Sequence, residues 1–501
     1  MCSRSLAADL TFNIIGPSLT ATSITDSRVE DPFPPISGSN FSYADVWAEN
    51  GYAYVGSDRS GRGTAIFSLS NAGIPTYLTQ YDGVAGDGSE YEDVEVYDGI
   101  GYFGADVSPT TSGTGVDIVD LSIPFEPLHK SRVNSSDCLT GSPGVCAHNK
   151  VHTLSIQRFD ANTPSEQRFL YTADNATDVV KITDVSNPSS PVLVASLDIS
   201  QTHPPLPFPQ LPGGVASHEV VVRNNRLFVA SKSSSTGTDG WFHIFDVANP
   251  ANPVLHKAFL SGARSHTAMP TDDGKTLVVA EERPGGNVKI YDISNINSPN
   301  DPDTPVLKAT LNTSNVCHAG TCITGYSPHH VHLYGNLMFL PWYDAGLQVL
   351  NISNPANPVL VGAFDTWAGA SNDYNGNWGV DLSMGLKRVL LSDRKRGLIV
   401  VDASGVVLPG DYNQDMVVND LDYNVWRSSY GATRSSVHDL ALADGNYDGV
   451  VDTVDYVIWR DHFGQVQSGA GSGSTAPEPA AILLFSAGAL LMASCRGRRN
   501  Q

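Results

Sequence analysis

The chain is poor in basic residues, in cysteine and in long apolar runs. Of its 501 residues, 30 are Lys or Arg and 52 are Asp or Glu, so the formal net charge is -22. A polyanion of this kind is repelled by phosphate backbones, so nucleic acid is not an expected partner. The hydrophobic fraction of 41% is enough for a folded protein but too low for one embedded in a membrane. The carboxylate excess suits calcium.

The sequence also lacks two common catalytic signatures. No serine stands in a nucleophile-elbow context, so a Ser-His-Asp triad is not predicted. No Gly-rich phosphate loop follows a strand and opens a helix. The sequence therefore gives no basis for either kind of site.

Stretches of helix-forming residues are few, whereas glycine and proline are plentiful. The chain has 46 Gly and 31 Pro, which favours an all-β architecture with many turns. A length of 501 residues is too great for one compact core, so more than one domain is expected.

A short pattern recurs along the first 400 residues. Each copy has an apolar strand, an Asp or Asn, a Ser-Asn-Pro turn and a Pro-Val-Leu strand, as in VKITDVSNPSSPVLVASL and LQVLNISNPANPVLVGAF. The turn side chain is expected to accept a hydrogen bond from the backbone N–H two residues on, and the proline then ends the ladder. Weaker copies bring the number to seven, and the turn residues are Ser68, Asp120, Asp184, Asp246, Asp292, Asn351 and Asp402.

Two further strands precede each copy, so each repeat should contain four strands. Seven such repeats over residues 40–408 predict a seven-bladed β-propeller, a closed fold that removes exposed sheet edges. The region resembles the LVIVD-repeat propellers, including bacterial surface proteins grouped as choice-of-anchor proteins, and GLIVVDAS is the nearest copy of the namesake motif. The resemblance implies a fold but no activity, because propellers host many functions.

Histidines recur at one position of the first strand in consecutive repeats. Because first strands surround the channel of a propeller, these side chains should meet near its mouth. Imidazole suits zinc, copper, iron or nickel, and an open position on the ion could activate water or oxygen. Two alternatives remain: each ring bonds to the backbone of the next blade, or the cluster gains charge below about pH 6.5. The candidate transition-metal ligands are His152, His218, His266, His329 and Glu92, with Glu219 nearby.

Four of the six cysteines lie in two small Gly-rich loops. Cys138 and Cys146 bound CLTGSPGVC, and Cys317 and Cys322 bound CHAGTC. Both pairs are predicted disulfides in an oxidising compartment. The alternative is a zinc site that adds the nearby histidines, and it requires the two loops to meet in space.

Residues 409–466 contain two twelve-residue loops, DYNQDMVVNDLD and DGNYDGVVDTVD, each followed by a helix-like segment. Oxygen-bearing side chains at positions 1, 3, 5, 9 and 12, with a carbonyl at position 7, predict one calcium ion per loop. Gly449 takes the sharp turn of the second loop and Met416 that of the first, so the second site should be the stronger. The predicted ligands are Asp411, Asn413, Asp415, Val417, Asn419, Asp422, Asp444, Asn446, Asp448, Val450, Asp452 and Asp455.

The loop pair resembles dockerin type I, which implies a small α-helical domain and a cohesin-like partner. In cellulosomal dockerins, polar residues at loop positions 10 and 11 carry recognition. Here those positions hold Asp420-Leu421 and Thr453-Val454, which departs from that pattern. The alternatives are a cohesin of another kind and a structural role within the chain.

The C-terminus consists of a Gly/Ser linker at 467–476 and a tail at 477–501. In the tail, Pro477-Glu478-Pro479 is followed by an apolar run and then by arginines. This order resembles the PEP-CTERM sorting signal of Gram-negative bacteria. The resemblance implies processing by an exosortase, delivery to the cell surface or extracellular matrix, and membrane contact only through the tail before processing.

The N-terminal segment 1–39 should hold a remnant of an export signal and a lead-in strand. It lacks an apolar signal core, so we expect the true start to lie upstream. The preferred interpretation is an exported, non-enzymatic protein whose propeller binds a ligand or another protein. The alternatives are an exported hydrolase or oxidoreductase with a His-bound metal at the channel mouth, and a passive spacer.

Overall fold

The structure is a computed structural model of the chain. It describes residues 20–21, 43–58, 63–70, 73–84, 90–107, 114–134, 137, 139, 150–161, 163–174, 177–199, 215–233, 240–262, 264–298, 304–312, 317–318, 321–322, 326–367, 374–433 and 442–467. Cys138, Cys146 and the predicted sorting motif Pro477-Glu478-Pro479 lie outside these residues.

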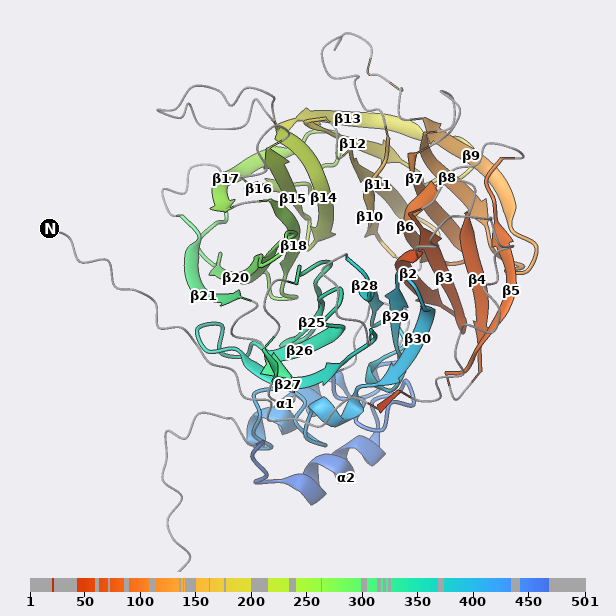
Figure 1. Cartoon of the computed structure of the whole chain (residues 1–501). Helices are drawn as coiled ribbons and strands as arrows, with labels where there is room; N and C mark the ends of the chain where they lie inside the picture. The colour runs from red at the N-terminus through yellow and green to blue at the C-terminus, as the bar shows by residue number, and fades with distance from the viewer. Residues whose placement is uncertain are drawn as a thin grey trace, which may run out of the picture.

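The described strands form seven four-stranded antiparallel sheets arranged as a ring (Figure 1). This confirms the predicted seven-bladed propeller. The first three blades comprise β2 (Tyr43–Glu49), β3 (Tyr52–Ser57), β4 (Thr64–Leu69) and β5 (Pro75–Tyr81); β6 (Glu90–Tyr97), β7 (Ile100–Val107), β8 (Gly115–Asp120) and β9 (Leu128–Asn134); and β10 (Thr153–Phe159), β11 (Gln167–Ala173), β12 (Val179–Asp184) and β13 (Val192–Asp198).

The next three blades follow the same order from the innermost to the outermost strand. They comprise β14 (Val215–Arg223), β15 (Arg226–Ser233), β16 (Gly240–Asp246) and β17 (Val254–Gly262); β18 (Ser265–Pro270), β19 (Thr276–Glu281), β20 (Asn287–Asp292) and β21 (Val306–Asn312); and β24 (His332–Tyr334), β25 (Leu337–Pro341), β26 (Leu347–Asn351) and β27 (Val359–Phe364). Between the last two of these blades, β22 (Cys317–His318) pairs with β23 (Thr321–Cys322).

The seventh blade is built from both ends of the propeller sequence. Its inner strands are β28 (Asn377–Asp381), β29 (Val389–Asp393) and β30 (Gly397–Asp402), and its outer strand is β1 (Thr20–Ala21). The prediction that the last repeat supplies its own outer strand is therefore wrong. The segment after β30 forms the 3-10 helix η3 (Ser404–Val406) instead of a strand. A second 3-10 helix, η2 (Leu386–Arg388), directly precedes β29. The early strand closes the ring because it covers the edge of β30.

The predicted Asx turns are present in six repeats. The backbone N–H two residues after the turn residue donates to its side chain at Asp120 (3.0 Å), Asp184 (2.9 Å), Asp246 (2.8 Å), Asp292 (3.0 Å), Asn351 (2.9 Å) and Asp402 (2.9 Å). These turns end the third strand of each blade at an equivalent residue.

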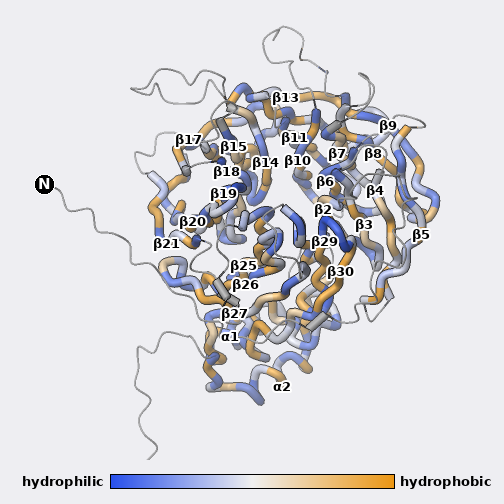
Figure 2. The backbone as a smooth tube through the Cα atoms, viewed as in Figure 1, coloured by the Kyte–Doolittle hydropathy of each residue, from blue (hydrophilic) through white to orange (hydrophobic). Residues whose placement is uncertain are grey.

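The blades are held together by apolar faces and by polar contacts between neighbours. Apolar and polar residues alternate along many strands of the ring (Figure 2). One apolar cluster joins the first three blades and buries Tyr54, Tyr102 and Leu154. Packing between blades, rather than within one sheet, therefore supplies the core.

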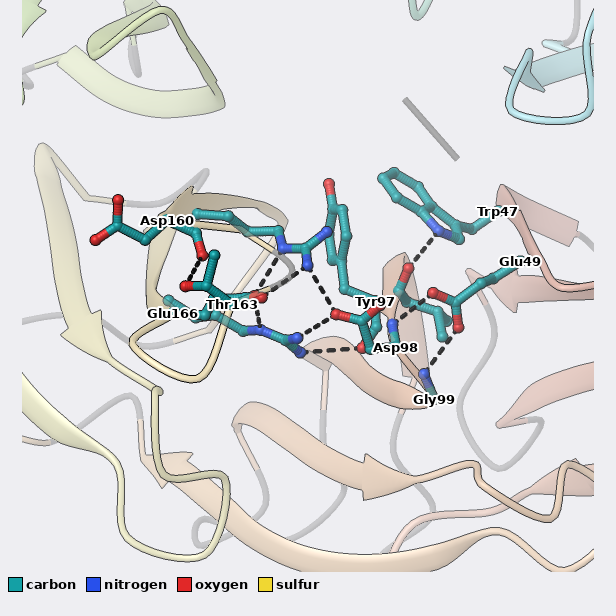
Figure 3. A network of polar contacts seen from close by, with 11 residues as sticks. Trp47, Glu49, Tyr97, Asp98, Gly99, Asp160, Thr163 and Glu166 are labelled. Carbon is teal, nitrogen blue, oxygen red and sulfur yellow. Dashed lines mark hydrogen bonds and ion pairs between the residues drawn. The ribbon is translucent and has the colours of Figure 1, made fainter. Parts of the chain in front are cut away.

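A polar network links the same three blades (Figure 3). Glu49 of β2 accepts hydrogen bonds from the backbone N–H groups of Asp98 (2.5 Å) and Gly99 (2.9 Å) in the turn between β6 and β7. The Asp98 carboxylate in turn pairs with Arg158 (2.8 Å) and with Arg168, both in the third blade. Blade one thus fixes the β6–β7 turn of blade two, and that turn is in turn ion-paired to blade three.

Two helices follow the propeller, α1 (Asp420–Ser429) and α2 (Thr453–His462), each preceded by one of the predicted loops. The two loop-helix units are related by equivalent contacts. The indole N–H of Trp426 donates to the carbonyl of Asp452 (2.7 Å), and that of Trp459 donates to the carbonyl of Asn419 (2.8 Å). We refer to residues 411–467 as the two-loop segment. None of the helices in the described part of the chain is long and apolar enough to cross a membrane.

The two-loop segment packs against blades six and seven, as Figure 1 shows near β27. The side-chain oxygen of Gln414 accepts a hydrogen bond from the backbone N–H of Asn336 (2.7 Å). The backbone carbonyl of Gln414 accepts one from the side-chain amide of Asn351 (2.8 Å). From the second loop, the carbonyl of Asn446 accepts from Lys387 (2.9 Å). Both loops therefore contact the propeller directly.

Candidate functional site at the mouth of the central channel

The predicted row of histidines forms a contiguous arc of buried rings. Ring centroids lie 4.4 Å apart for His152 and His218, 4.2 Å for His218 and His266, and 4.4 Å for His266 and His329. Trp378 of the seventh blade continues the arc, 4.3 Å from His329. Four consecutive blades therefore bring their imidazoles together, as the sequence predicts.

A local irregularity of the first strands explains why these side chains meet. In five blades the register between the first and second strands shifts at the residue of this row, at Ala44, Glu92, His218, His266 and Trp378. A β-bulge leaves one residue unpaired and re-aims its side chain. Two of the four histidines, His218 and His266, lie at such bulges. The sequence does not reveal it, because a bulge adds no distinctive residue here.

Three contacting residues were missed by the sequence analysis because they lie on the second strand of their blades or just after it. Asp106 lies in β7, Glu282 directly follows β19 and Tyr343 follows β25. The signal was present in the sequence: the equivalent residue is charged in most repeats, as in Asp58 and Arg394, which pair with each other. The first and second strands of the blades therefore both contribute side chains to the site.

His152, at one end of the arc, is held by two carboxylates. Its Nδ1 lies 3.0 Å from Glu92 and 3.5 Å from Asp106, and Asp106 also pairs with Lys150 (3.1 Å). Burial works against the charged ring, but the two carboxylates outweigh it and raise the pKa of His152 to about 10. Burial raises the pKa of Glu92 to about 7, although His152 opposes that rise. His152 is therefore an ion-paired imidazolium.

The other three histidines share an environment that keeps them neutral. Burial lowers the pKa of His218, His266 and His329 well below the usual value, and neighbouring positive groups add to the effect, above all Lys232 for the first two. Burial lowers the pKa of Lys232 as well. These three rings therefore gain a proton only at a lower pH than an ordinary histidine does, and a charge gain of the cluster in acid stays a prediction.

Hydrogen bonds define which nitrogen of two rings carries the proton. His329 Nδ1 lies 2.7 Å from the carbonyl of Trp378, which can only accept. Thr267 donates its hydroxyl hydrogen to Glu219 (2.7 Å), so its oxygen accepts from His266 Nδ1 at 3.0 Å. In both rings Nδ1 is the donor, and Nε2 is left with a lone pair.

Both lone pairs face one carboxylate. His266 Nε2 lies 3.6 Å from one oxygen of Glu282, and His329 Nε2 lies 3.9 Å from the other. Tyr343 donates to the same carboxylate (2.8 Å) and fixes its orientation. His218 completes the group: donor atoms of His218, His266 and Glu282 all lie within 4.8 Å of one another. A second such group consists of Glu92, Asp106 and His152.

The residues that follow the histidine row form a second layer in the channel. The hydroxyl of Thr153 donates to the carbonyl of His218 in the next blade (2.8 Å), and the hydroxyl oxygen of Thr267 lies 3.3 Å from the carbonyl oxygen of His329. The alternative that each histidine ring itself bonds to the next blade fits only His329. A cavity of about 340 Å³ lies along this layer and is lined by, among others, Asp45, Asp93, Glu95, Glu219, His330 and His332.

The predicted calcium ligands lie in two loops with matching hydrogen bonds. Asp411 accepts from the backbone N–H groups of Asp415 (3.1 Å) and Met416 (2.9 Å), and Asp444 accepts from those of Asp448 (3.0 Å) and Gly449 (2.8 Å). The first-position carboxylate thus organises both loops in the same way.

The last carboxylate of each loop folds back over the loop. Asp422 accepts from the backbone N–H groups of Asn413 (3.0 Å) and Asn419 (2.7 Å). Asp455 makes the matching contact to Asp452 (2.8 Å). Burial, followed by the charges of neighbouring carboxylates, raises the pKa of Asp411 to about 7. A cation would relieve this crowding, so the residues fit calcium.

The part that the other predicted ligands play in binding calcium remains a prediction. Val418 and Val451, at position 8 of the two loops, are fully buried. Met416 has a φ of 71°, which confirms the strained backbone expected there. Of the predicted disulfides, only the backbone of the second pair is described, and its register places Cys317 opposite Cys322. That disulfide remains a prediction.

Comparisons with known proteins agree with the resemblance drawn from the repeats. Residues 160–313 match the family model described as Choice-of-anchor I domain, and residues 327–366 match the LVIVD repeat. No curated protein matches the chain. The first match spans most of blades three to five, and the second spans blade six.

Three solved structures illustrate a distant likeness to this chain. The β-propeller domain of Cps50 (Swd1) from Myceliophteria thermophila is 12% identical, with a TM-score of 0.48 over 74% of this chain and 99% of that chain. The periplasmic gluconolactonase PpgL of Pseudomonas aeruginosa is 12% identical, with a TM-score of 0.46 over 72% of this chain and 96% of that chain. A functionally unknown protein from Desulfotomaculum acetoxidans is 14% identical, with a TM-score of 0.43 over 66% of this chain and 86% of that chain.

Proposed function

We propose that this chain is an exported cell-surface or extracellular-matrix protein whose propeller is a rigid binding platform. The observation that carries the proposal is the arc of buried imidazoles and carboxylates at one end of the channel, which a purely structural propeller does not need. The match to a Choice-of-anchor I domain supports a surface or secreted location. The tail at 477–501, with its resemblance to a PEP-CTERM signal, supports processing by an exosortase.

The two-loop segment is proposed to be a dockerin-like module that binds two calcium ions. The matching loop hydrogen bonds and the crowded carboxylates support this role. Residues at positions 10 and 11 are available to a partner, because Leu421 is 56% exposed and Val454 48% exposed. A cohesin-like protein would therefore meet a more apolar surface than the polar one of cellulosomal dockerins. The contacts between the two-loop segment and the propeller support a structural role in addition to partner binding.

A second candidate function is that of an exported metalloenzyme, a hydrolase or an oxidoreductase. It is favoured by one observation, the group of donor atoms from His218, His266 and Glu282. Three protein ligands leave an open position on a tetrahedral ion, which is typical of catalytic sites.

The proposed function is tested by protease treatment of intact cells that produce the full chain, with calcium and with a calcium chelator. We expect the propeller to be degraded from outside without lysis. The two-loop segment should resist the protease only in calcium, because bound ions stabilise the loops. The variant Asp448→Ala should lose that resistance, whereas Asp420→Ala, which changes no predicted ligand, should keep it.

Protection of the chain until the cells are lysed would contradict export. Digestion of the two-loop segment at the same rate with and without calcium would contradict the calcium sites. The two parts of the proposal therefore fail separately.

A further inference from the structure

We infer that His218, His266 and Glu282, with His329 beside them, hold one divalent transition-metal ion such as zinc at the channel mouth. The inference deepens the proposed binding platform and rests on it, because it specifies what the arc of side chains binds. It leaves His152 and Glu92, two of the residues first considered from the sequence, outside the set of ligands.

The first argument is that atoms with lone pairs face one another. His266 and His329 each commit Nδ1–H to another acceptor, so each presents an unprotonated Nε2 to an oxygen of Glu282. Imidazole lone pairs and carboxylate oxygens repel each other unless a cation lies between them. The contacts of 3.6 and 3.9 Å are also too long for hydrogen bonds, so an added proton would not satisfy them as they stand.

The second argument is geometric. Two ligands bound at 2.0–2.1 Å to the same tetrahedral ion lie about 3.4 Å apart. The observed separations of 3.6 and 3.9 Å are close to this value and need only small movements of side chains. By contrast, the 3.0 Å contact between His152 and Glu92 has the length of a hydrogen bond, which that pair already makes without a metal.

The third argument is an unsatisfied polar atom. His218 is only 2% exposed, and in the described part of the structure its Nδ1 has no hydrogen-bond partner. A buried imidazole without a partner costs free energy, and a metal ligand role removes that cost. Its ring contacts that of His266, so one ion can reach both rings.

Neighbouring groups fix the orientation of the proposed ligands. Thr267 and Glu219 hold Nδ1 of His266, the carbonyl of Trp378 holds Nδ1 of His329, and Tyr343 holds Glu282. Metal-bound histidines usually donate their other ring N–H to such groups, which fixes the tautomer and the ring orientation. His218, His266 and Glu282 come from two blades and His329 from a third, so the ion would bridge three blades.

The experiment is a titration of the purified full chain with Zn²⁺, with calcium kept in excess so that the two loops stay filled. We expect one zinc ion per chain. His218→Ala and His266→Ala should each weaken binding by at least about 100-fold, since loss of an outer-shell partner alone costs 10- to 100-fold. Tyr343→Phe should weaken it by about 10- to 100-fold without lowering the melting temperature of the zinc-free protein.

His152→Ala is the matched control, because this ring touches His218 but is already ion-paired. It should bind zinc as the wild type does. Co²⁺ serves as a second probe, and its visible absorption bands should appear in wild type and His152→Ala and be absent in His218→Ala. If His218→Ala does not fold, as judged by circular dichroism, Glu282→Gln gives the same reading.

The inference is overturned if the calcium-loaded wild type binds neither Zn²⁺ nor Co²⁺. It is also overturned if His152→Ala weakens binding as much as His218→Ala, or if the ligand variants bind as the wild type does. None of these results affects the surface exposure and calcium protection expected for the proposed function, so the two failures are distinguishable.

Discussion

Met416 occupies the loop position that the second loop fills with Gly449, and it keeps a left-handed backbone there. The structure gives the reason for this residue. Its side chain is buried in an apolar cluster that contains Leu337 and Val406 of the propeller region. The backbone strain of the first loop is therefore offset by contact with blades six and seven, which the second loop lacks at this position.

Met416→Gly tests this account at the level of one residue. Removal of the buried side chain should cost about 2–5 kcal/mol, and relief of the left-handed backbone should return about 1–2 kcal/mol. We expect the free energy of unfolding, measured by denaturant melts in calcium, to fall by about 1–3 kcal/mol. An increase in stability would mean that the strain outweighs the contact. Gly449→Ala is the control, and it should cost about 1 kcal/mol through backbone strain alone.

Glu95, which lines the cavity in the channel, should make the stability of the protein depend on pH. Burial, followed by the charge of Asp93, raises its pKa well above the usual value, and its carboxylate accepts from the backbone N–H of Ile156 (3.0 Å). Asp45 and Tyr97 are the other titratable groups that act on it. A raised carboxyl pKa contributes stability below the unfolded pKa of about 4.3, and that stability is lost as pH rises through the folded pKa.

Glu95→Gln keeps the acceptor oxygen and removes the charge. We therefore expect it to raise the free energy of unfolding relative to wild type at about pH 8 and to change it little at about pH 4. Urea melts at the two pH values provide the measurement. The same difference at both values, or a greater loss at the higher one, would show that the carboxylate is not protonated in the folded channel.

At the scale of the element, the two-residue strand β1 closes the ring of blades. It contributes only two residue pairs, Thr20 with Asp402 and Ala21 with Val401, but these pairs join the start of the chain to the last blade. Without them the edge of β30 is exposed, and exposed edges promote association between molecules. The repeat pattern could not reveal this strand, because Thr20 and Ala21 carry no repeat motif.

Two truncations test the closure of the ring. A chain that begins at residue 40 lacks β1, whereas a chain that begins at residue 16 retains it. We expect the shorter chain to lose about 1–3 kcal/mol of stability, the contribution of the lost hydrogen bonds, and to scatter more light on heating. Equal melting and equal scattering of the two chains would show that β1 does not close the propeller.

At the scale of the whole molecule, seven similar blades form one site to which each blade contributes a different set of side chains. The same strand position holds an alanine in blade one, a glutamate in blade two, histidines in blades three to six and a tryptophan in blade seven. Repetition fixes the backbone, and substitution at one position in each repeat creates the chemistry. The two-loop segment contacts blades six and seven, so it adds a second asymmetry to the ring.

The sequence by itself determined the number of blades, the turns that end their third strands and the row of histidines. It could do so because alternation, Asn-Pro turns and recurrence are local properties, and the six Asx turns are confirmed at the predicted residues. It also predicted the loops and helices of the two-loop segment, since their spacing is fixed within twelve residues.

Only the tertiary structure decided which side chains share a site. Glu282, Asp106 and Tyr343 lie on or after second strands, whereas the histidines that they contact lie on or before first strands, so their meeting depends on strand pairing and on packing between blades. The structure likewise separated the ion-paired His152 from the neutral His218, because burial and neighbouring charge set the protonation of each ring. Closure of the ring by β1 is a third such property, since it pairs residues about 380 positions apart that no local pattern relates.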